Sequence, residues 1–307
     1  MKYLLAEYEN KWKNDIFRNY YYIIQELIKH DFKLLDMSNI SKANYKDILI
    51  DPTMIIIIEN HNDTLPNDWI TDLFDHNAPL YLITDDFHKN FGRKILINYY
   101  HHFKKIFCPY YIPFLLKYPG LEEKLIWFPH AVPKEFKKEV KLDALNKILM
   151  TGIVGKVYPM RIIYRDLAKT KEYKYKLDIL NHISPKYAPI NTETDLVGDK
   201  FIDKISRYKS SFTCGSEWGY LVTKYFEIPL AGSLLFCDMP KDNLELLGFK
   251  DNINCIFYNK DNLIEKINWI VDPKNNQVIN QIRKNGQELI LNNHTWDLRI
   301  SQLLSLL

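Results

Sequence analysis

The stretch GYLVTKYFEIPLAGSLLFCD, residues 219–238, joins a glycine-bearing turn, an apolar helical pattern and a strand-like apolar run. A helix that leads directly into a buried strand is the unit from which α/β domains are built. A single acid, Glu227, lies among the apolar residues of this helix. It is either a partly exposed residue on a helix face or a carboxylate that binds hydroxyl groups at a ligand cleft.

The same alternation of strand-like and helical patterns extends outward from this stretch. In the first half, residues 2–8, 32–38, 53–60 and 79–86 read as strands, and helical patterns lie between them. The run TMIIIIEN (53–60) is almost continuously apolar and β-branched, which is typical of a strand buried on both faces. This order predicts an α/β fold with parallel, doubly wound sheets.

A charged segment divides the chain into two halves. PKEFKKEVKLDALN (133–146) begins with proline, lacks a long apolar run and reads as a linker, after which the alternation restarts. We therefore expect two Rossmann-like domains that face a cleft, at residues 1–140 and 141–292. The last segment, 293–307, is predicted to be a helix that packs back on the first domain.

Composition narrows the class of protein. A formal charge of +3 on 307 residues is too small to indicate a nucleic-acid or membrane partner. No run reaches the roughly 18 apolar residues of a spanning helix, and MKYLLAEYENKWKND becomes charged too early for a secretory signal. We expect a cytoplasmic protein without a transmembrane segment. The cysteines have no C-x-x-C spacing and read as reduced core thiols: Cys108, Cys214, Cys237 and Cys255.

The segment LMTGIVGKVYPMR (149–161) is the first candidate for anion binding. A strand ends at Gly152, a short loop carries Gly155 and Lys156, and a helix begins near Pro159. A helix N-terminus presents free backbone N–H groups, and Arg161 adds positive charge. The pattern is neither G-x-G-x-x-G nor a P-loop, so an ordinary strand–helix turn is the alternative interpretation.

The loop TCGSEWGYL (213–221) repeats this arrangement. Its glycines precede a helix, so the N–H groups from Tyr220 to Thr223 can also face an anion. Glu227 lies three residues after Lys224, on the same helix face. An ionised carboxylate can accept hydrogen bonds from both hydroxyls of a ribose. Two such loops and one such acid predict a site for a nucleoside diphosphate.

Polar residues also follow two strands of the first half. Glu59, Asn60 and His61 follow one strand, while Asp85, Asp86 and His88 follow the next. In doubly wound sheets ligands lie at these carboxyl ends, so any of the six could orient or deprotonate an acceptor hydroxyl. The alternative is that they cap the following helices. The sequence contains no D-x-D pair, so we expect no metal ion and no cofactor beyond the nucleotide-sugar co-substrate.

Several segments of the second half together resemble GT-B glycosyltransferases. In the group similar to the spore-maturation protein CgeB, related to glycosyltransferase families 1 and 4, a basic residue precedes a helix glutamate by three and an Ala/Cys-Gly follows. Lys224, Glu227 and Ala231-Gly232 occupy those places, and HTWDLR (294–299) matches a segment near the end. GIVGKVYPMR (152–161) is similar to a further segment of the group.

The resemblance implies a function and roles for individual residues. It implies transfer of a sugar from a nucleotide-diphosphate sugar, UDP- or GDP-linked, to a hydroxyl of a glycan, lipid or protein acceptor, without metal and with retention. Many retaining members carry two glutamates separated by seven residues, but the first position here is Gly219. The alternatives are a non-catalytic nucleotide-sugar binder and a GT-B-shaped epimerase. The expected catalytic residues are His61, Asp86, His88 and Glu217. The expected donor-binding residues are Gly152, Gly155, Lys156, Tyr158, Arg161, Gly219, Tyr220, Leu221, Thr223, Lys224 and Glu227.

Overall fold

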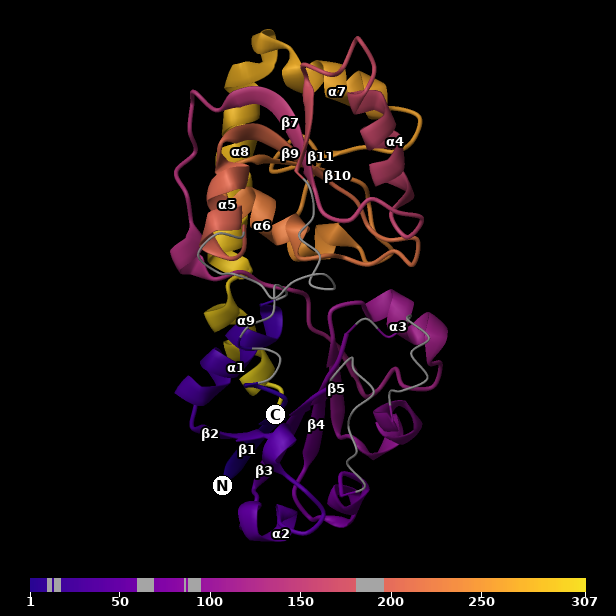
Figure 1. The fold of residues 1–307 in the computed structure, drawn as a ribbon, viewed down its shortest axis with the longest axis vertical. Helices are drawn as coiled ribbons and strands as arrows, with labels where there is room; N and C mark the ends of the chain where they lie inside the picture. The colour runs from indigo at the N-terminus through magenta and orange to yellow at the C-terminus, as the bar shows by residue number, and fades with distance from the viewer. Residues whose placement is uncertain (10–12, 14–17, 60–68, 86, 88–94, 181–195) are drawn as a thin grey trace. The chain divides into compact units, whose positions relative to one another are not determined.

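The computed structural model describes all residues except 10–12, 14–17, 60–68, 86, 88–94 and 181–195. The chain divides into two compact units (Figure 1). The first comprises residues 1–129 and 300–307, and the second comprises residues 130–299. The sequence placed its boundary at 140/141, within the segment that it read as a linker. The four cysteines are buried and unbridged.

The first unit contains a parallel sheet of six strands in the order β2-β1-β3-β4-β5-β6. In β3 four consecutive isoleucines are buried, as expected for a strand covered on both faces. The strands are β1 (Lys2–Ala6), β2 (Phe32–Asp36), β3 (Met54–Ile58), β4 (Leu80–Ile83), β5 (Lys105–Cys108) and β6 (Leu125–Trp127). The α-helices are α1 (Asn19–Lys29), α2 (Tyr45–Ile48) and α3 (Tyr111–Lys117).

Two helical segments of this unit are 3-10 helices in their described parts. The pattern LPNDWITDLFDHN (65–77) forms one at Thr71–Asp75, and the residues before β5 form another at Ile95–His102. At the end of the chain, the Tyr81 hydroxyl of β4 donates a hydrogen bond to the carbonyl of Leu307, 2.9 Å away. This bond joins the last residues to the first sheet.

The second unit contains a parallel sheet of five strands in the order β11-β10-β9-β7-β8. The strands are β7 (Leu145–Thr151), β8 (Leu177–Leu180), β9 (Tyr208–Thr213), β10 (Leu234–Cys237) and β11 (Ile256–Phe257). The α-helices are α4 (Pro159–Ala168), α5 (Asp199–Ser206), α6 (Lys224–Leu230), α7 (Leu263–Val271), α8 (Asn276–Asn293) and α9 (Trp296–Leu304). The last helix begins in this unit and ends in the first. Two parallel α/β sheets confirm the predicted fold class.

The two faces of the second sheet are covered differently. Helices α4 and α7 lie on one face, whereas α5, α6 and α8 lie on the other (Figure 1). Beneath α4 and α7 the core is aromatic and aliphatic: Phe212 of β9 stacks on Tyr258 at 5.0 Å and packs against Tyr164 of α4 at 4.6 Å. The β9 residues that point to the opposite face are Lys209, Ser211 and Thr213, because side chains alternate along a strand.

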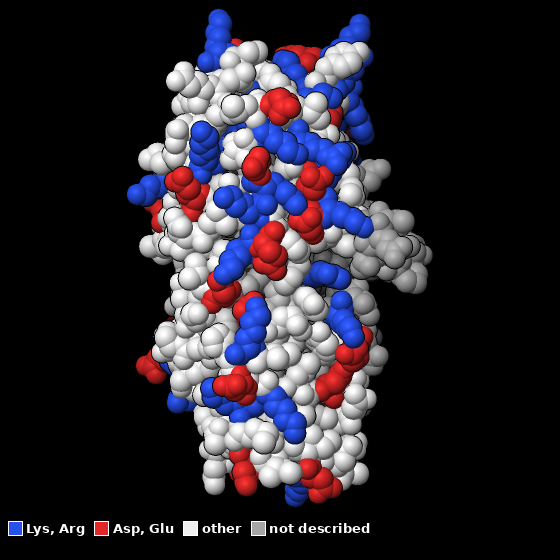
Figure 2. All heavy atoms as spheres, turned by 90° about the vertical axis from the view of Figure 1, so that its left-hand side faces the viewer, with Lys and Arg blue, Asp and Glu red and all other residues white. Residues whose placement is uncertain are grey.

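Surface charges of both signs are interspersed on the face shown in Figure 2. On α5, Asp199 pairs with Lys138 at 2.5 Å and Asp203 pairs with Arg207 at 2.8 Å. Exposed pairs of this kind contribute little to stability, but they reduce the net field of the lysines around them. None of the helices in the described ranges is long and apolar enough to cross a membrane.

Candidate active site

The strand order places a topological switch point in the second sheet between β7 and β9. The chain leaves β7 for β8 on one side and returns to β9 on the other. Loops that follow the two strands therefore separate at this point and leave room for a ligand at the carboxyl end of the sheet. These loops are residues 152–158 after β7 and residues 214–223 after β9. Both were predicted as anion-binding loops.

Gly152, Arg161 and Lys224 meet at this switch point. The backbone of Gly152 has φ +102°, a region that L side chains rarely adopt, and a Cβ atom there would lie 2.6 Å from an Arg161 Nη atom. The same Cβ would lie 3.3 Å from Cε of Lys224. Two cationic side chains, one from α4 and one from α6, thus lie directly against a bare stretch of backbone. This is the arrangement expected around an anion.

Arg161 is held in place without using all its donors. It is 3% exposed, its guanidinium lies 3.8 Å above the Tyr158 ring, and it donates to the carbonyl of Ile153 at 3.1 Å. Its Nε atom is buried and has no hydrogen-bond partner in the described part of the chain. An unsatisfied buried donor costs about 1–3 kcal/mol, so this atom is poised to bind an acceptor.

Lys224 and Glu227 face the same environment from the first turn of α6. Desolvation lowers the pKa of Lys224, and Arg161 lowers it further, while the Glu227 carboxylate raises it. Desolvation raises the pKa of Glu227, and the Lys224 charge opposes this rise. The Glu227 side chain is half-buried. Arg161 and Lys224 carry two positive charges against the one carboxylate of Glu227, so the site has an excess of positive charge.

The loop after β9 is fixed on both sides. The Glu217 N–H donates to the carbonyl of Val157 at 2.7 Å, which joins the two candidate anion loops, and the Lys241 N–H donates to the carbonyl of Gly219 at 3.1 Å. Gly219 has φ +81°, and an added Cβ would overlap the Lys241 side chain. A side chain therefore does not fit at Gly219, the position that the resemblance assigns to the first glutamate.

Asp238 is a residue at this edge of the sheet that the sequence reasoning missed. Its Oδ1 accepts hydrogen bonds from the Gly215 N–H at 2.9 Å and the Tyr225 hydroxyl at 2.5 Å. Burial raises the pKa of this carboxyl, while the Tyr225 and Gly215 bonds lower it. Asp238 thus ties the loop after β9 to α6. Its position directly after the buried strand LLFC was the available signal, because polar residues at a parallel strand's carboxyl end face the ligand edge.

Tyr220 and Leu221 contribute differently from what was expected. Their side chains are buried in the core, at 3% and 0% exposed, and the Tyr220 N–H is directed to Ser216 Oγ at 3.4 Å. Helix α6 begins only at Lys224, so Tyr220 does not start it. Because the Tyr220 N–H is directed to Ser216, the N–H groups of Leu221 to Thr223 are the better candidates to face an anion. The other expected residues of the two loops differ in exposure. In the loop after β7, Gly155 is half-buried and Lys156 is exposed; in the loop after β9, Thr223 is half-buried and Glu217 is exposed.

The expected catalytic residues of the first unit, His61, Asp86 and His88, lie outside the described residues. Glu59, directly before them, is 1% exposed and accepts hydrogen bonds from the Thr84 hydroxyl and from the Tyr100 hydroxyl, the latter at 3.1 Å. Its carboxylate is therefore buried in the core and bonded to two hydroxyl groups. Within the described ranges no three His, Cys, Asp or Glu side chains gather as a metal site.

The HTWDLR segment is a structural connection in the second unit. The His294 ring lies 2.8 Å from the Leu247 carbonyl through Nε2 and 2.8 Å from Arg299 through Nδ1. Because Arg299 can only donate, Nδ1 accepts and Nε2 carries the proton. Burial and the Arg299 charge lower the pKa of His294 to about 4. The neutral ring thereby fixes the end of α8.

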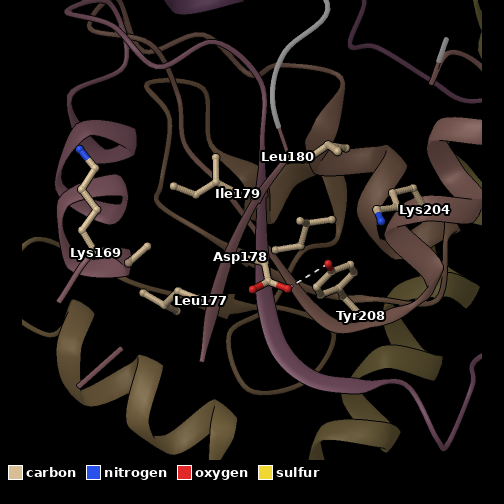
Figure 3. A pocket seen from close by; sticks show the side chains of 9 residues that line it. Lys169, Leu177, Asp178, Ile179, Leu180, Lys204 and Tyr208 are labelled. Carbon is tan, nitrogen blue, oxygen red and sulfur yellow. Dashed lines mark hydrogen bonds between the residues drawn. The ribbon is translucent and has the colours of Figure 1, made fainter. Parts of the chain in front are cut away.

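A hollow of about 340 Å³ lies away from these residues, at the β8 edge of the sheet (Figure 3). Asp178 lines it and is bonded to Lys147 at 2.9 Å and to the Tyr208 hydroxyl at 3.0 Å. None of the expected donor-binding residues lines this hollow. We therefore assign the candidate site to the β7/β9 switch point and not to the hollow.

Comparisons with known protein families and with solved structures both find similarity to glycosyltransferases. Residues 156–305 match the model of a family described as glycosyl transferase-like. No curated protein sequence matches the chain. Similar solved structures include an alpha-glucosyltransferase in complex with UDP-glucose and DNA containing an abasic site, with TM-score 0.63 and 12% identity over 99% of this chain and 98% of that one. Anabaena Alr3699/HepE in complex with UDP and glucose has TM-score 0.65 and 11% identity over 100% of both chains.

A third similar structure is a glycosyltransferase from Rickettsia africae, with TM-score 0.61 and 12% identity over 99% of this chain and 97% of that one. At these identities the likeness shows the fold alone. DNA in one of these structures means that the expectation of no nucleic-acid partner is not supported. Residues 156–305 are thus similar to a glycosyl transferase-like family, and the chain as a whole has the fold of the GT-B glycosyltransferases.

Proposed function

We propose that this glycosyltransferase-like enzyme moves a sugar from a UDP-sugar to an acceptor hydroxyl, without a metal ion and with retention of the anomeric configuration. The observation that carries the proposal is the meeting of Gly152, Arg161 and Lys224 at the β7/β9 switch point. Family and fold support the reaction class, and structures of the same fold bind UDP and UDP-glucose.

The diphosphate of the donor would lie against Gly152. There the bare backbone allows close approach, the Arg161 Nε is unsatisfied, and Lys224 supplies a second positive charge. The positive end of the α4 dipole lies at the same loop, although Pro159 has no N–H group and the Arg161 N–H donates to the Tyr158 carbonyl at 3.0 Å. As the bond to the sugar breaks, charge grows on the departing diphosphate, and cations held in a desolvated site stabilise it. No metal ion is needed for this role.

Glu227 would hold the ribose of the donor. It lies on the same helix as Lys224, and in its ionised form it can accept from both ribose hydroxyls. The Lys224 charge and the N-terminal half of a helix favour that ionised form against the cost of burial. Of the remaining expected donor residues, Gly155, Lys156 and Tyr158 belong to the loop before α4, while Gly219, Tyr220, Leu221 and Thr223 shape the loop before α6.

We assign binding of the acceptor substrate to the first unit. His61, Asp86 and His88 remain the proposed residues that orient or deprotonate the acceptor hydroxyl, since they follow β3 and β4 in sequence. We propose a glycan, lipid or protein acceptor. The alpha-glucosyltransferase of similar fold supports the proposal of retention, because UDP-glucose is itself α-linked and an α-product keeps that configuration. Exposed Glu217 is the acid nearest in sequence to the position of the missing first glutamate.

A second candidate function is nucleotide-sugar binding without transfer. The observation that favours it is Gly219, whose backbone and Lys241 neighbour leave no space for the acid found in many retaining enzymes. Both candidates share the donor site and differ only in turnover. Incubation with UDP-glucose and a panel of glycan, lipid, peptide and DNA acceptors distinguishes them: release of UDP with a glycoside product supports transfer, whereas binding without UDP release supports the second candidate.

Calorimetry with UDP tests the donor site itself. Glu227→Gln keeps the shape but replaces one acceptor oxygen with a donor, so UDP affinity should fall roughly 10- to 100-fold, the value of a charge-assisted hydrogen bond. Arg161→Met and Lys224→Met should weaken it similarly, and the circular dichroism of each variant reports folding. The matched control is Glu245→Gln, an exposed acid of the same unit. Unchanged UDP affinity in a folded Glu227→Gln or Arg161→Met variant would refute the assignment.

A further inference from the structure

A second cluster of cations lies inside the second unit, on the sheet face covered by α5, α6 and α8. Lys209 of β9 is 4% exposed and Arg283 of α8 is 1% exposed. Neither forms an ion pair with a carboxylate in the described part of the chain. Isolated buried charges are costly, so two of them without a counter-charge require an explanation.

The side-chain partners of both cations are neutral asparagines. Lys209 Nζ lies 2.7 Å from Oδ1 of Asn276, and an Arg283 Nη atom lies 2.8 Å from Oδ1 of Asn280. Arg283 Nε donates to the Gly232 carbonyl at 2.8 Å. Each asparagine uses its acceptor oxygen on a cation, so its amide nitrogen remains as a donor, and neither nitrogen bonds a described residue. The cluster is therefore rich in donors and poor in acceptors.

One donor of the cluster is unsatisfied. The second Nη atom of Arg283 is buried and has no hydrogen-bond partner among the described residues. Arginine does not deprotonate in proteins, so the charge remains. Burial lowers the pKa of Arg283 to about 10, and burial together with the Arg283 charge lowers the pKa of Lys209 to about 8. Asp272 acts on Lys209 in the opposite direction, but only at longer range.

The cluster has a defined position and a route to solvent. A stripe of four polar residues follows one face of α8 at helical spacing: Asn276, Asn280, Arg283 and Gln287. Asn276 accepts a hydrogen bond from Lys209 of β9, and Arg283 donates one to the Gly232 carbonyl just before β10. Asn276 is exposed, Asn280 is half-buried and Arg283 is fully buried, so the stripe leads inward from the surface. It begins beside the amino end of β9, whereas the candidate donor site lies at the carboxyl end.

We propose that Lys209, Arg283 and the amide nitrogens of Asn276 and Asn280 bind a small inorganic anion of the chloride type between β9 and α8. A monovalent anion offsets one of the two positive charges and accepts from the unsatisfied Nη atom. A halide ion fits a donor-rich cluster better than water does, because water must place two hydrogens of its own on acceptors. The site is structural and is independent of the sugar-transfer reaction.

Thermal unfolding of the full chain tests the proposal in solution. Sodium chloride replaces sodium gluconate at constant ionic strength, so that general screening stays the same. Once chloride exceeds its dissociation constant, each tenfold increase should raise the Tm of the second unit by about 3–6 °C. Lys209→Met should abolish most of this dependence, while Lys260→Met, which removes an exposed lysine of the same unit, should keep it.

Bromide locates the ion directly. A crystal grown in bromide should show an anomalous peak within hydrogen-bonding distance of the unsatisfied Arg283 Nη atom, and the peak should weaken in Lys209→Met. Phosphate in place of chloride distinguishes the kind of anion: stabilisation by phosphate alone overturns the halide assignment. A Tm that does not respond to chloride, an equal response in Lys209→Met, or the absence of a bromide peak refutes the site. Arg283→Met is a supporting variant only, since loss of its Gly232 bond can unfold the chain.

Discussion

Two glycines of one loop should respond oppositely to the same substitution. At Gly152, φ is +102° and a new Cβ would lie 2.6 Å from an Arg161 Nη atom; at Gly155 nothing lies within 4 Å and φ is not positive. Gly152→Ala must therefore strain the backbone and displace a guanidinium held by Ile153 and Tyr158. In Gly155→Ala the new Cβ has no neighbour within 4 Å. The substitution also lowers the conformational entropy of the unfolded chain, which favours the folded state.

The expected magnitudes follow from these contacts. A side chain at such a backbone angle costs about 1–3 kcal/mol, so the free energy of unfolding of Gly152→Ala should fall by about that amount. Displacement of Arg161 removes a charge-assisted hydrogen bond to the diphosphate, which should weaken UDP binding roughly 10- to 100-fold. Gly155→Ala should be neutral or stabilised by up to about 1 kcal/mol. UDP affinity comes from calorimetry and stability from urea unfolding. Equal UDP affinity in Gly152→Ala and wild type would refute the diphosphate site, as would an equal loss in Gly155→Ala.

Two further outcomes are expected from the same unit. UDP binding should persist in EDTA, because Arg161 and Lys224 supply the positive charge; affinity lost on chelation and restored by manganese would contradict this. The stability of the second unit should decline as the pH falls from about 6.5 to about 4, because His294 has its folded pKa at about 4 and takes up a proton more readily when unfolded. The full difference is about 3 kcal/mol, and a His294→Gln variant, measured by urea unfolding across this range, should lose most of that slope.

The fold could be predicted from local patterns because buried parallel strands read directly as apolar runs. Two examples are the four isoleucines of β3 and the run LLFC of β10. Consecutive apolar residues in a strand indicate that both faces of the strand are buried. Helices were less certain, since an apolar spacing near three suits 3-10 and α-helices alike. Residues 71–75 and 95–102 show this ambiguity, and in both cases the 3-10 form is observed.

The candidate site depended on information that local patterns lack. Each loop was visible by its glycines, but the meeting of Arg161 with Lys224 requires β7 and β9 to be neighbours, and strand order is a property of the whole sheet. Asp238 was missed for the same reason, because it reaches the loop after β9 only once β10 lies beside that strand. The burial of polar residues on one face of β9, Lys209 and Ser211 among them, likewise depends on helices that pack on the strand only in the folded unit.

The two cation clusters of the second unit should act independently, and this separates them experimentally. They lie at opposite ends of β9, a strand of six residues that spans about 20 Å. At the carboxyl end, the charges of Arg161 and Lys224 would be compensated only when the donor diphosphate is bound. At the amino end, Lys209 and Arg283 would keep their anion whether or not the donor is bound. At that separation the effects of two ligands add, so saturating UDP and saturating chloride together should raise the Tm by the sum of their separate shifts. If chloride instead cancels the shift produced by UDP, the anion occupies the diphosphate position, and the separate site between β9 and α8 is wrong.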